Sequence, residues 1–282
     1  MAKVAFLGTG LLGSAMIEGM LRRGDAVTVW NRTESKALAL QKLGASVAAT
    51  ARDAVTHADR VHMTLPDDSV VDRMLADVAP RLASCAIVVD HSTTSPRGTA
   101  GRLTRLRRDG LKIIHAPVFM SPQMARDSVG LMLVSGPHAV FDVVHDDLRK
   151  MTGEVWYLGD EPGTAAAYKL FGNSMLFVIT AGVTDVFAMA KGLGMSPADA
   201  LQVFSKFQPG GVIKARGDKM ARGDFSASFE LTMARKDLRL MIEAAHGQPM
   251  TILPAIAQRM DEAIAKGHGS DDMGAMAAEV IR

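Results

Sequence analysis

The stretch Val4-Ala5-Phe6-Leu7-Gly8-Thr9-Gly10-Leu11-Leu12-Gly13 lies near the N-terminal end of the sequence. An apolar run of strand length leads into the pattern Gly-x-Gly-x-x-Gly, and residues with helical periodicity follow. Gly8 permits a tight turn, Gly10 lets a pyrophosphate approach the backbone, and Gly13 allows close packing of helix on strand. Free N–H groups and the positive dipole at the helix start would bind the pyrophosphate. This context favours a dinucleotide-binding unit over a glycine-rich turn without a ligand.

Short apolar runs alternate with helical segments from Val4 to Leu158. The expected strands are Val4–Leu7, Ala26–Trp30, Arg60–Thr64, Ile87–Asp90, Lys112–Ala116, Leu131–Ser135 and Val155–Leu158. The expected helices are Leu11–Arg23, Glu34–Leu43, Asp68–Val78, Ser95–Arg108 and Pro137–Lys150. Apolar strands alternating with helices indicate a mostly parallel sheet covered on both faces. We therefore predict an α/β, Rossmann-like N-terminal domain.

After the turn Gly159–Gly163 the strand signals stop, and apolar residues recur at helical spacing. The expected helices are Thr164–Leu193, Pro197–Phe207, Phe229–Ala245, Thr251–Lys266 and Met273–Ile281. The first of these is nearly apolar all round in its middle, which is typical of a buried spine or a subunit interface. We predict two domains: residues 1–161 bind the dinucleotide, and residues 162–282 form an all-α domain for substrate binding and dimerisation.

Composition excludes several function classes. The 282 residues are 48% hydrophobic and 22% charged, as in ordinary globular proteins. Lys and Arg total 32 against 30 Asp and Glu, so the chain lacks the basic excess of a nucleic-acid or anionic-membrane binder. The uncharged stretches Val4–Ile17 and Leu170–Thr184 are too short to span a bilayer, and no secretory cleavage pattern is evident. We expect a cytoplasmic protein without nucleic-acid or membrane partners.

Three further patterns have ordinary structural interpretations. The single cysteine, Cys85, precedes an expected buried strand and is interpreted as a small hydrophobe rather than a nucleophile. The eight histidines show no metal-ligand spacing, so we expect no metal site. The basic run Arg102–Arg108 fits the solvated face of a surface helix better than a phosphate-binding stripe.

The residues after the second expected strand favour NADP over NAD. An NAD site usually has Asp or Glu here to bind the ribose hydroxyls, whereas this chain has Asn31-Arg32-Thr33 with Lys36 one turn on. A guanidinium and a hydroxyl suit a 2′-phosphate, which a carboxylate would repel. The alternative is that Arg32 is an ordinary surface residue and Thr33 only an N-cap, although Thr33 could serve both purposes.

Two other expected strands end in polar or turn-forming residues. Thr64-Leu65-Pro66-Asp67 follows one strand, and Asp90-His91-Ser92-Thr93-Thr94-Ser95-Pro96 follows the next. Singly, each is typical of a helix-capping turn. The carboxyl ends of parallel strands form the edge where such sheets bind ligands. Their placement beside the glycine loop therefore favours a shared cofactor site.

Lys169 and Asn173 are i, i+4 neighbours and share one face of a predicted helix. Lys169 is the one charged residue between Glu161 and Asp185. A lone ammonium in an apolar stretch should have its pKa lowered by desolvation, as a lysine that exchanges protons near neutral pH requires. The alternative is a lysine that extends to solvent near a helix start.

Together these features resemble the β-hydroxyacid dehydrogenase family, which includes 3-hydroxyisobutyrate dehydrogenases and semialdehyde reductases and is related to 6-phosphogluconate dehydrogenase. The likeness covers essentially the whole length. Its motifs here are Phe6–Gly13, Asp90-x-Ser92-Thr93, Ala116-Pro117-Val118, Gly163…Lys169…Asn173 and Lys236-Asp237-Leu238.

This resemblance implies a Rossmann-like domain, an all-helical domain, and a dimer or higher oligomer packed through the helical halves. It implies that Lys169 is the general acid/base and Asn173 its positioning partner. Leu65, Pro66, Thr93 and Lys236 match positions where the family contacts its cofactor.

The expected substrate loop departs from the family pattern. Where the family has Asp-Ala-Pro-Val-Ser-Gly-Gly, this chain has His115-Ala116-Pro117-Val118-Phe119-Met120-Ser121. Phe119 and Met120 offer apolar bulk instead of donors for a substrate carboxylate, and Ser121 is the candidate replacement donor. This loop and Val29–Thr33 are also similar to imine reductases, which generally lack the lysine.

Three hypotheses stay open at this point. One is an NADP(H)-dependent enzyme for a 3-hydroxy acid, or related alcohol, and its semialdehyde or carbonyl. Another is an imine reductase-like enzyme for apolar or cyclic imines and carbonyls. The last is an NADP-binding protein without catalysis.

Overall fold

The computed structural model describes residues 2–281, and the chain forms two compact units. The first unit runs to Asn173 and the second begins at Ser174, so the division falls within helix α8, Thr164–Gly192. The expected boundary after residue 161 divides a cofactor-binding domain from a substrate-binding domain, and this functional division stays a prediction.

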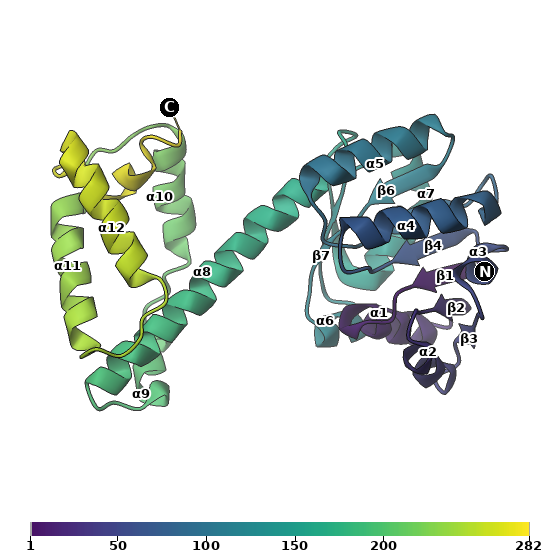
Figure 1. Cartoon of the computed structure of the whole chain (residues 1–282), viewed down its shortest axis with the longest axis horizontal. Helices are drawn as coiled ribbons and strands as arrows, with labels where there is room; N and C mark the ends of the chain where they lie inside the picture. The colour runs from purple at the N-terminus through teal and green to yellow at the C-terminus, as the bar shows by residue number, and fades with distance from the viewer. Residues whose placement is uncertain (1, 282) are drawn as a thin grey trace. The chain divides into compact units, whose positions relative to one another are not determined.

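A six-stranded parallel sheet is the centre of the first unit, in the order β3-β2-β1-β4-β5-β6 (Figure 1). The strands are β1 Val4–Leu7, β2 Val27–Trp30, β3 Ser46–Val47, β4 Arg60–Met63, β5 Ile87–Asp90 and β6 Lys112–His115. Strand β1 pairs with β2 on one side and β4 on the other, in register from Val4 to Leu7. The predicted Rossmann-like sheet is confirmed.

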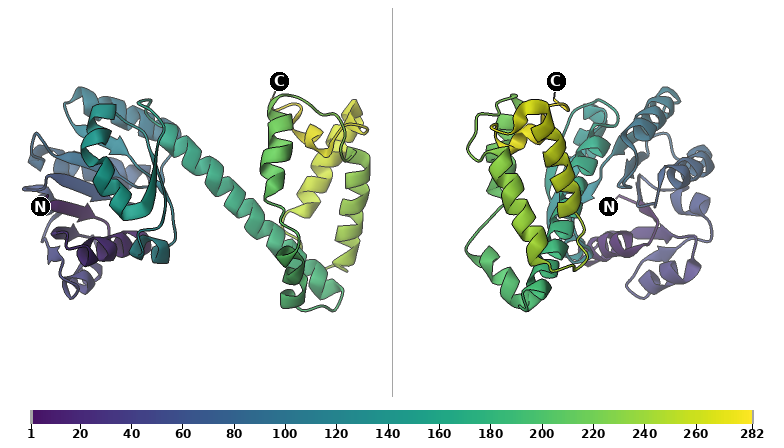
Figure 2. Two further views of the ribbon diagram at one scale, coloured as in Figure 1. Left: turned by 180° about the vertical axis from the view of Figure 1, so that it is seen from behind. Right: turned by 60° about the vertical axis from the view of Figure 1, so that its left-hand side comes forward.

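Helices cover both faces of this sheet (Figure 2). They are α1 Leu11–Arg22, α2 Glu34–Gln41, α3 Ala51–Val55, α4 Asp68–Val78, α5 Pro96–Arg108 and α7 His138–Thr152. Because side chains alternate across a strand, Phe6 faces the core with α1, α2 and α7, whereas Leu7 faces the core with α3, α4 and α5. This two-sided burial explains the nearly continuous apolar strands.

Two expected strands do not extend this sheet. Strands β8, Gly130–Val134, and β9, Gly153–Tyr157, are parallel to each other and join the short β7, Val118–Phe119, in a second sheet. Strand β7 pairs with β8 in the antiparallel sense, and a His115–Ser135 bridge connects the region to β6. Strands β3 and β7 and helices α3 and α6, Pro122–Arg126, were not expected, because each is too short for a periodic pattern.

The structure corrects the interpretation of the basic run at Arg102 and places Cys85 at the surface. Arg102 is only 2% exposed, and its guanidinium bonds to Asp68 at 2.7 Å and Asp72 at 3.0 Å, so it joins α5 to α4. The basic run is therefore not simply a solvated face. Cys85 is exposed, because β5 begins only at Ile87 and leaves the cysteine in the preceding turn.

The second unit is helical, as predicted. It contains the remainder of α8 and the helices α9 Pro197–Leu201, α10 Gly211–Ala221, α11 Leu231–Ala244 and α12 Leu253–Ala263. Its core packs Leu231, Ala234 and Leu238 of α11 against Ala257 and Met260 of α12. Helix α10 was not expected, and the expected last helix is a five-residue 3-10 helix, Met273–Ala277.

Two buried carboxylates hold the loops of this unit. Asp185 of α8 accepts hydrogen bonds from the backbone N–H groups of Thr251, Ile252 and Leu253, which begin α12. Asp272 accepts from the Ser228 hydroxyl at 2.6 Å and from several backbone N–H groups. Such bonds lower the pKa of both carboxyls, despite the opposing effect of burial.

The middle of helix α8 is exposed in the single chain, which does not match a buried spine and leaves the subunit interface as a prediction. Phe171 is 64% exposed and Phe177 is 74% exposed, although the middle of the helix is apolar. By length and composition alone, α8 is the one helix among residues 2–281 that would suffice to cross a membrane. The expectation that it is too short considered only its uncharged part, Leu170–Thr184.

Candidate active site

A cavity of about 660 Å³ opens where strands β1, β2, β4 and β5 end. This volume is within the range of small-molecule sites. The residues that line it are Gly8, Gly10, Leu11, Leu12, Gly13, Trp30, Asn31, Arg32, Thr33, Lys36, Thr64, Leu65, Pro66, Val70, Arg73, Met74, Asp77, His91, Ser92 and Thr93. The structure thus brings most of the predicted cofactor residues together around one space.

The glycine loop is tight on one side and open on the other. Gly8 has φ +98°, and a Cβ there would lie 2.2 Å from the Thr64 carbonyl oxygen. A Cβ on Gly13 would lie 2.2 Å from the Gly8 carbonyl oxygen, whereas one on Gly10 would meet nothing within 4 Å. Space above Gly10 and the start of α1 therefore fits a pyrophosphate on free N–H groups.

Asn31 ties the glycine loop to the end of β2. Its Oδ1 accepts from the Thr9 backbone N–H at 3.0 Å, and its Nδ2 donates to the Thr33 carbonyl at 2.9 Å. Thr33 stands at the N-cap position of α2, yet its side chain makes no capping bond within the described chain. Asn31 thus shapes the loop, whereas the Thr33 hydroxyl stays available to a ligand.

Three cationic side chains line the cavity: Arg32, Lys36 and Arg73. Within residues 2–281, none of them makes a side-chain hydrogen bond or an ion pair. Asp77, the acidic residue of the same wall, is instead paired with Arg52 at 2.7 Å. The cations are therefore available for a bound anion, as a 2′-phosphate would require.

One wall of the cavity was missed in the sequence. It consists of Val70, Arg73, Met74 and Asp77, all on α4. Their spacing of i, i+3, i+4 and i+7 is that of a single helix face, so the pattern was present. The sequence did not show that this face of α4 lies toward the end of β2.

Asp67 and Lys236 have other surroundings. Asp67 is the N-cap of α4, where it accepts from the Ser69 hydroxyl at 2.7 Å and the Val70 N–H at 2.9 Å, bonds that lower its pKa. It is absent from the described cavity wall. Lys236 belongs to α11 of the second unit and pairs with Asp237 at 2.6 Å. A cofactor contact from either residue stays a prediction.

Lys169 lies near the start of α8, and its surroundings are apolar. The side chain is half-buried, and Nζ lies 4.1 Å from the ring centroid of Phe119. Desolvation lowers the pKa of this amine. No carboxylate of residues 2–281 lies within ion-pair distance of it. Asn173 follows one turn later and is also half-buried.

The expected substrate loop is divided among several structural roles. Pro117 and Val118 are buried, and Met120 packs against Gly130. The Ser121 hydroxyl accepts from the Met124 N–H at 3.2 Å as the N-cap of α6, which leaves its own O–H as a donor, so its role as the replacement donor stays a prediction. The loop therefore presents mainly the ring of Phe119 toward Lys169.

A chain of buried histidines lies beside the cavity and was not anticipated. Arg60, paired with Asp147, donates from Nε to His62 Nε2 at 2.9 Å. His62 Nδ1 lies 2.8 Å from His91 Nε2, and His91 Nδ1 lies 2.7 Å from the Ala116 carbonyl oxygen. Desolvation lowers the pKa of His62 well below its usual value and that of His91 to about 4. Both rings are therefore neutral and hold strand ends in place.

Comparison with known families accounts for nearly the whole chain. Residues 3–159 match the NAD-binding domain of 6-phosphogluconate dehydrogenase. Residues 163–280 match the domain described as NAD-binding of NADP-dependent 3-hydroxyisobutyrate dehydrogenase. The chain belongs to this oxidoreductase superfamily. The resemblance predicted from the motifs is confirmed, and NAD(P) binding follows from it.

Curated relatives are distant and carry different names. A 2-(hydroxymethyl)glutarate dehydrogenase of Eubacterium barkeri is 24% identical over 97% of this chain and 93% of its own length. The cytokine-like nuclear factor N-PAC of Anopheles gambiae is 25% identical over 97% of this chain. This chain spans about half the length of that relative, 49%.

Solved structures share the fold. An imine reductase from Myxococcus stipitatus, in complex with NADP+, superposes with a TM-score of 0.90 over 98% of both chains. Its sequence is 22% identical, so the likeness concerns the fold alone. Imine reductases are thus among the proteins that share this architecture.

Proposed function

We propose that the protein is an NADP(H)-dependent oxidoreductase that interconverts a 3-hydroxy acid, or a related alcohol, and its semialdehyde or carbonyl. The observation that carries this proposal is the amine of Lys169, half-buried and without an ion-pair partner among the described residues. Membership in the 3-hydroxyisobutyrate dehydrogenase superfamily supports it.

The chemistry of Lys169 follows from its lowered pKa. A bound nicotinamide would supply or accept the hydride. In reduction, protonated Lys169 donates a proton from Nζ to the carbonyl oxygen of the substrate. In oxidation, neutral Lys169 removes the hydroxyl proton. Asn173, one helical turn away, orients the amine and the substrate, and such catalysis contributes roughly 10²–10⁴-fold.

NADP is the proposed cofactor because the cavity offers unpaired cations on its β2 side. Arg32 comes from the turn between β2 and α2, Lys36 from the first turn of α2, and Arg73 from α4. Three positive groups without an ion-pair partner in the described chain suit the extra phosphate of NADP better than the free hydroxyls of NAD.

The decisive experiment is Lys169→Ala, assayed by NADPH absorbance on 3-hydroxy acids, semialdehydes, other carbonyls and cyclic imines. We expect turnover of the best substrate to fall roughly 10²–10⁴-fold while NADPH binding persists. Lys191→Ala is the matched control, because Lys191 is exposed near the other end of the same helix. Near-normal turnover by Lys169→Ala would overturn the assignment.

A second candidate function rests on the apolar loop. Phe119, whose ring lies beside the amine of Lys169, stands where the family has a polar donor. An imine reductase-like enzyme for apolar or cyclic imines and carbonyls would suit these surroundings. In the same assay, turnover of carboxylates alone would eliminate this candidate, and turnover of imines alone would eliminate the first.

A protein that binds NADP without catalysis is the third candidate, favoured by the nuclear-factor names of some relatives. It predicts NADPH binding, no turnover of any substrate, and no effect of Lys169→Ala on cofactor affinity. The isolated amine of Lys169 favours the catalytic proposals, because an unpaired buried charge costs stability without such a role.

We further propose a cytoplasmic homodimer or higher oligomer, with α8 covered by a second copy. The uncharged part of α8, Leu170–Thr184, is shorter than the roughly 20 residues a bilayer requires. Asp185, which follows it, is engaged in capping α12. Light scattering after size exclusion should give at least twice the monomer mass, and Phe177→Asp should reduce it. A wild-type monomer would refute the proposal.

A further inference from the structure

Phe119 contacts α8 at two points. Its ring face lies under Lys169, with Nζ 4.1 Å from the centroid. Its ring edge lies against Gly172, where an added Cβ would come within 2.3 Å of Cζ and 2.6 Å of Cε1. The ring therefore fits into a space that exists only because position 172 has no side chain.

The position of this ring is determined by the second sheet. Phe119 pairs with Leu131 across β7 and β8, and Val118 beside it is buried. The neighbouring Met120 packs on Gly130. Backbone pairing on one side and the surface of Gly172 on the other leave the ring few alternative orientations.

An aromatic face favours a cation above it. The ring quadrupole stabilises an ammonium within about 6 Å of the centroid, and more strongly when the site is desolvated. At Lys169 this attraction opposes the desolvation that lowers the pKa of the amine. Among the described residues, no carboxylate performs this function for Lys169.

We infer that Phe119 is a positioning residue for Lys169, and that Gly172, which has no side chain, provides the space for the ring of Phe119. The ring holds the amine in place and retains its proton against burial. This inference rests on the proposed acid/base function of Lys169. The apolar residue at position 119 would therefore serve proton transfer by Lys169. A polar side chain at this position would offer the amine no aromatic face.

The first test is the pH dependence of carbonyl reduction by Phe119→Leu, which keeps apolar bulk and loses the ring. Reduction needs protonated Lys169, so the rate declines on the alkaline side of its pKa. We expect this limb to move to lower pH by roughly 0.5–1.5 units, the range that cation–π energies imply. Phe119→Tyr, which keeps the ring, should restore the wild-type limb.

Gly172→Ala should act in the same direction, because its Cβ displaces the ring. Phe207→Leu, an exposed aromatic of the second unit, is the control and should leave the limb unchanged. Circular dichroism melts of every variant identify any that fail to fold. Wild-type pH limbs in both Phe119→Leu and Gly172→Ala would overturn the inference.

A second measurement separates this inference from the proposed function. Lysine labelled at Cε reports Lys169 by NMR without any substrate, with Lys169→Arg identifying its signal. We expect ring-current shifts of the ε protons in the wild type, lost in Phe119→Leu, together with the lowered amine pKa. If Lys169→Ala is active but these shifts are present, the catalytic role fails and the ring contact stands. Absence of the shifts in the wild type refutes the contact.

Discussion

The cofactor cavity and the surroundings of Lys169 lie in the same unit but are constructed differently. The cavity depends on backbone: Gly8 and Gly13 have no room for a Cβ, and Gly10 leaves space for a ligand. The Lys169 site depends on side chains, with the amine over Phe119 and the ring against Gly172. A backbone cradle suits any dinucleotide, whereas side chains can change with the substrate. The glycine loop accordingly follows the family pattern, whereas at the second site Lys169 and Asn173 follow it and Phe119 departs from it.

The histidine chain lies between these two regions. Of the effects predicted here, the loss of its stabilising contribution at acid pH should be the largest. His91 is neutral when folded, with a pKa of about 4 against 6.5 for an unperturbed histidine. The unfolded chain therefore takes up the proton first as pH falls, so the stabilisation is complete above about pH 6.5 and declines toward pH 4. Loss of the neutral histidines should lower the unfolding free energy by a few kcal/mol, to order of magnitude, across this window.

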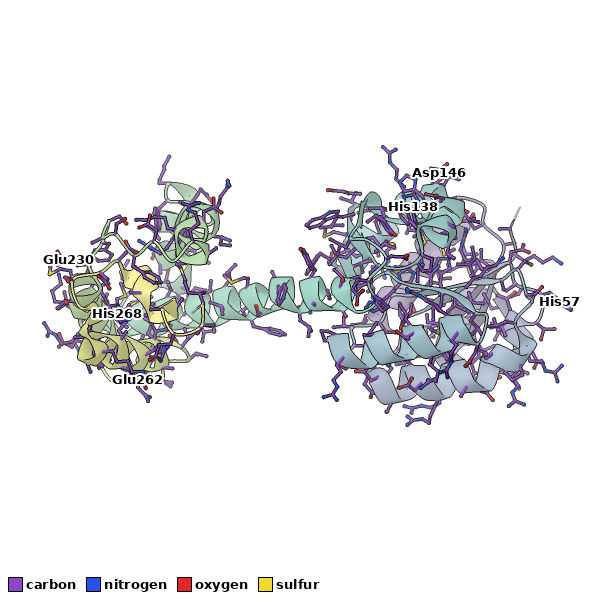
Figure 3. All side chains as sticks on the ribbon, turned by 90° about the horizontal axis from the view of Figure 1, so that it is seen from above. His57, His138, Asp146, Glu230, Glu262 and His268 are labelled. Carbon is purple, nitrogen blue, oxygen red and sulfur yellow. The ribbon has the colours of Figure 1, made fainter. Side chains whose placement is uncertain are left out.

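Denaturant melts between pH 7.5 and 4.5 measure this slope. His91→Gln should flatten it, and His57→Gln should not, because His57 is exposed at the surface (Figure 3). The carboxylates with lowered pKa, such as Asp147 and Asp185, contribute mainly below this window. An unchanged slope in His91→Gln would show that the imidazole is not the titrating group.

Next in size is the effect of a side chain in the glycine loop. Gly13→Ala places a Cβ 2.2 Å from the Gly8 carbonyl and 2.4 Å from Thr64 Oγ1, so the loop must shift. We expect NADPH affinity to fall roughly 10–100-fold, as overpacking of this kind implies. Gly101→Ala, where a Cβ meets nothing within 4 Å, should leave affinity unchanged. Fluorescence titration with NADPH measures both, and equal affinities would refute the backbone-cradle model.

A smaller effect is expected for the cofactor phosphate. Arg32→Asp should weaken NADPH binding about tenfold or more and change NADH binding little, because only NADPH carries the 2′-phosphate. Arg108→Asp is the control, since Arg108 is an exposed arginine on α5, away from the described cavity wall. Parallel titrations with the two cofactors give the ratio. An equal loss for both would remove the argument for NADP.

What could be predicted from the sequence depended on distance along the chain. The glycine loop was evident because strand, turn and helix are contiguous, and the strands around it were found nearly to the residue. Arg73 was missed because its helix face is visible in sequence but its neighbour across the cavity is not. Phe119 was identified in the substrate loop, and Gly172 stands within the Lys169–Asn173 motif. Their contact could not be predicted, because it joins segments far apart in sequence. The histidine chain crosses strands and has no linear pattern.

Helix α8 shows a different reason why the sequence leaves a question open. An apolar helix must be covered, but periodicity does not say by what, and the isolated chain leaves Phe171 and Phe177 exposed. The Arg102 error has the opposite origin. A basic run resembles a solvated face unless the acidic residues of a neighbouring helix, here Asp68 and Asp72, are known to meet it.

The hydrogen bonds from Arg60 to Ala116 all point the same way. Since Arg60 can only donate and the Ala116 carbonyl can only accept, each imidazole between them receives on Nε2 and gives from Nδ1. The tautomers of His62 and His91 are thus dictated from the two ends, and neither ring can flip alone. A second proton on either ring would place two N–H donors opposite each other and disrupt the whole chain. The four groups therefore act as one unit that connects α7 with the loop that leads to Phe119.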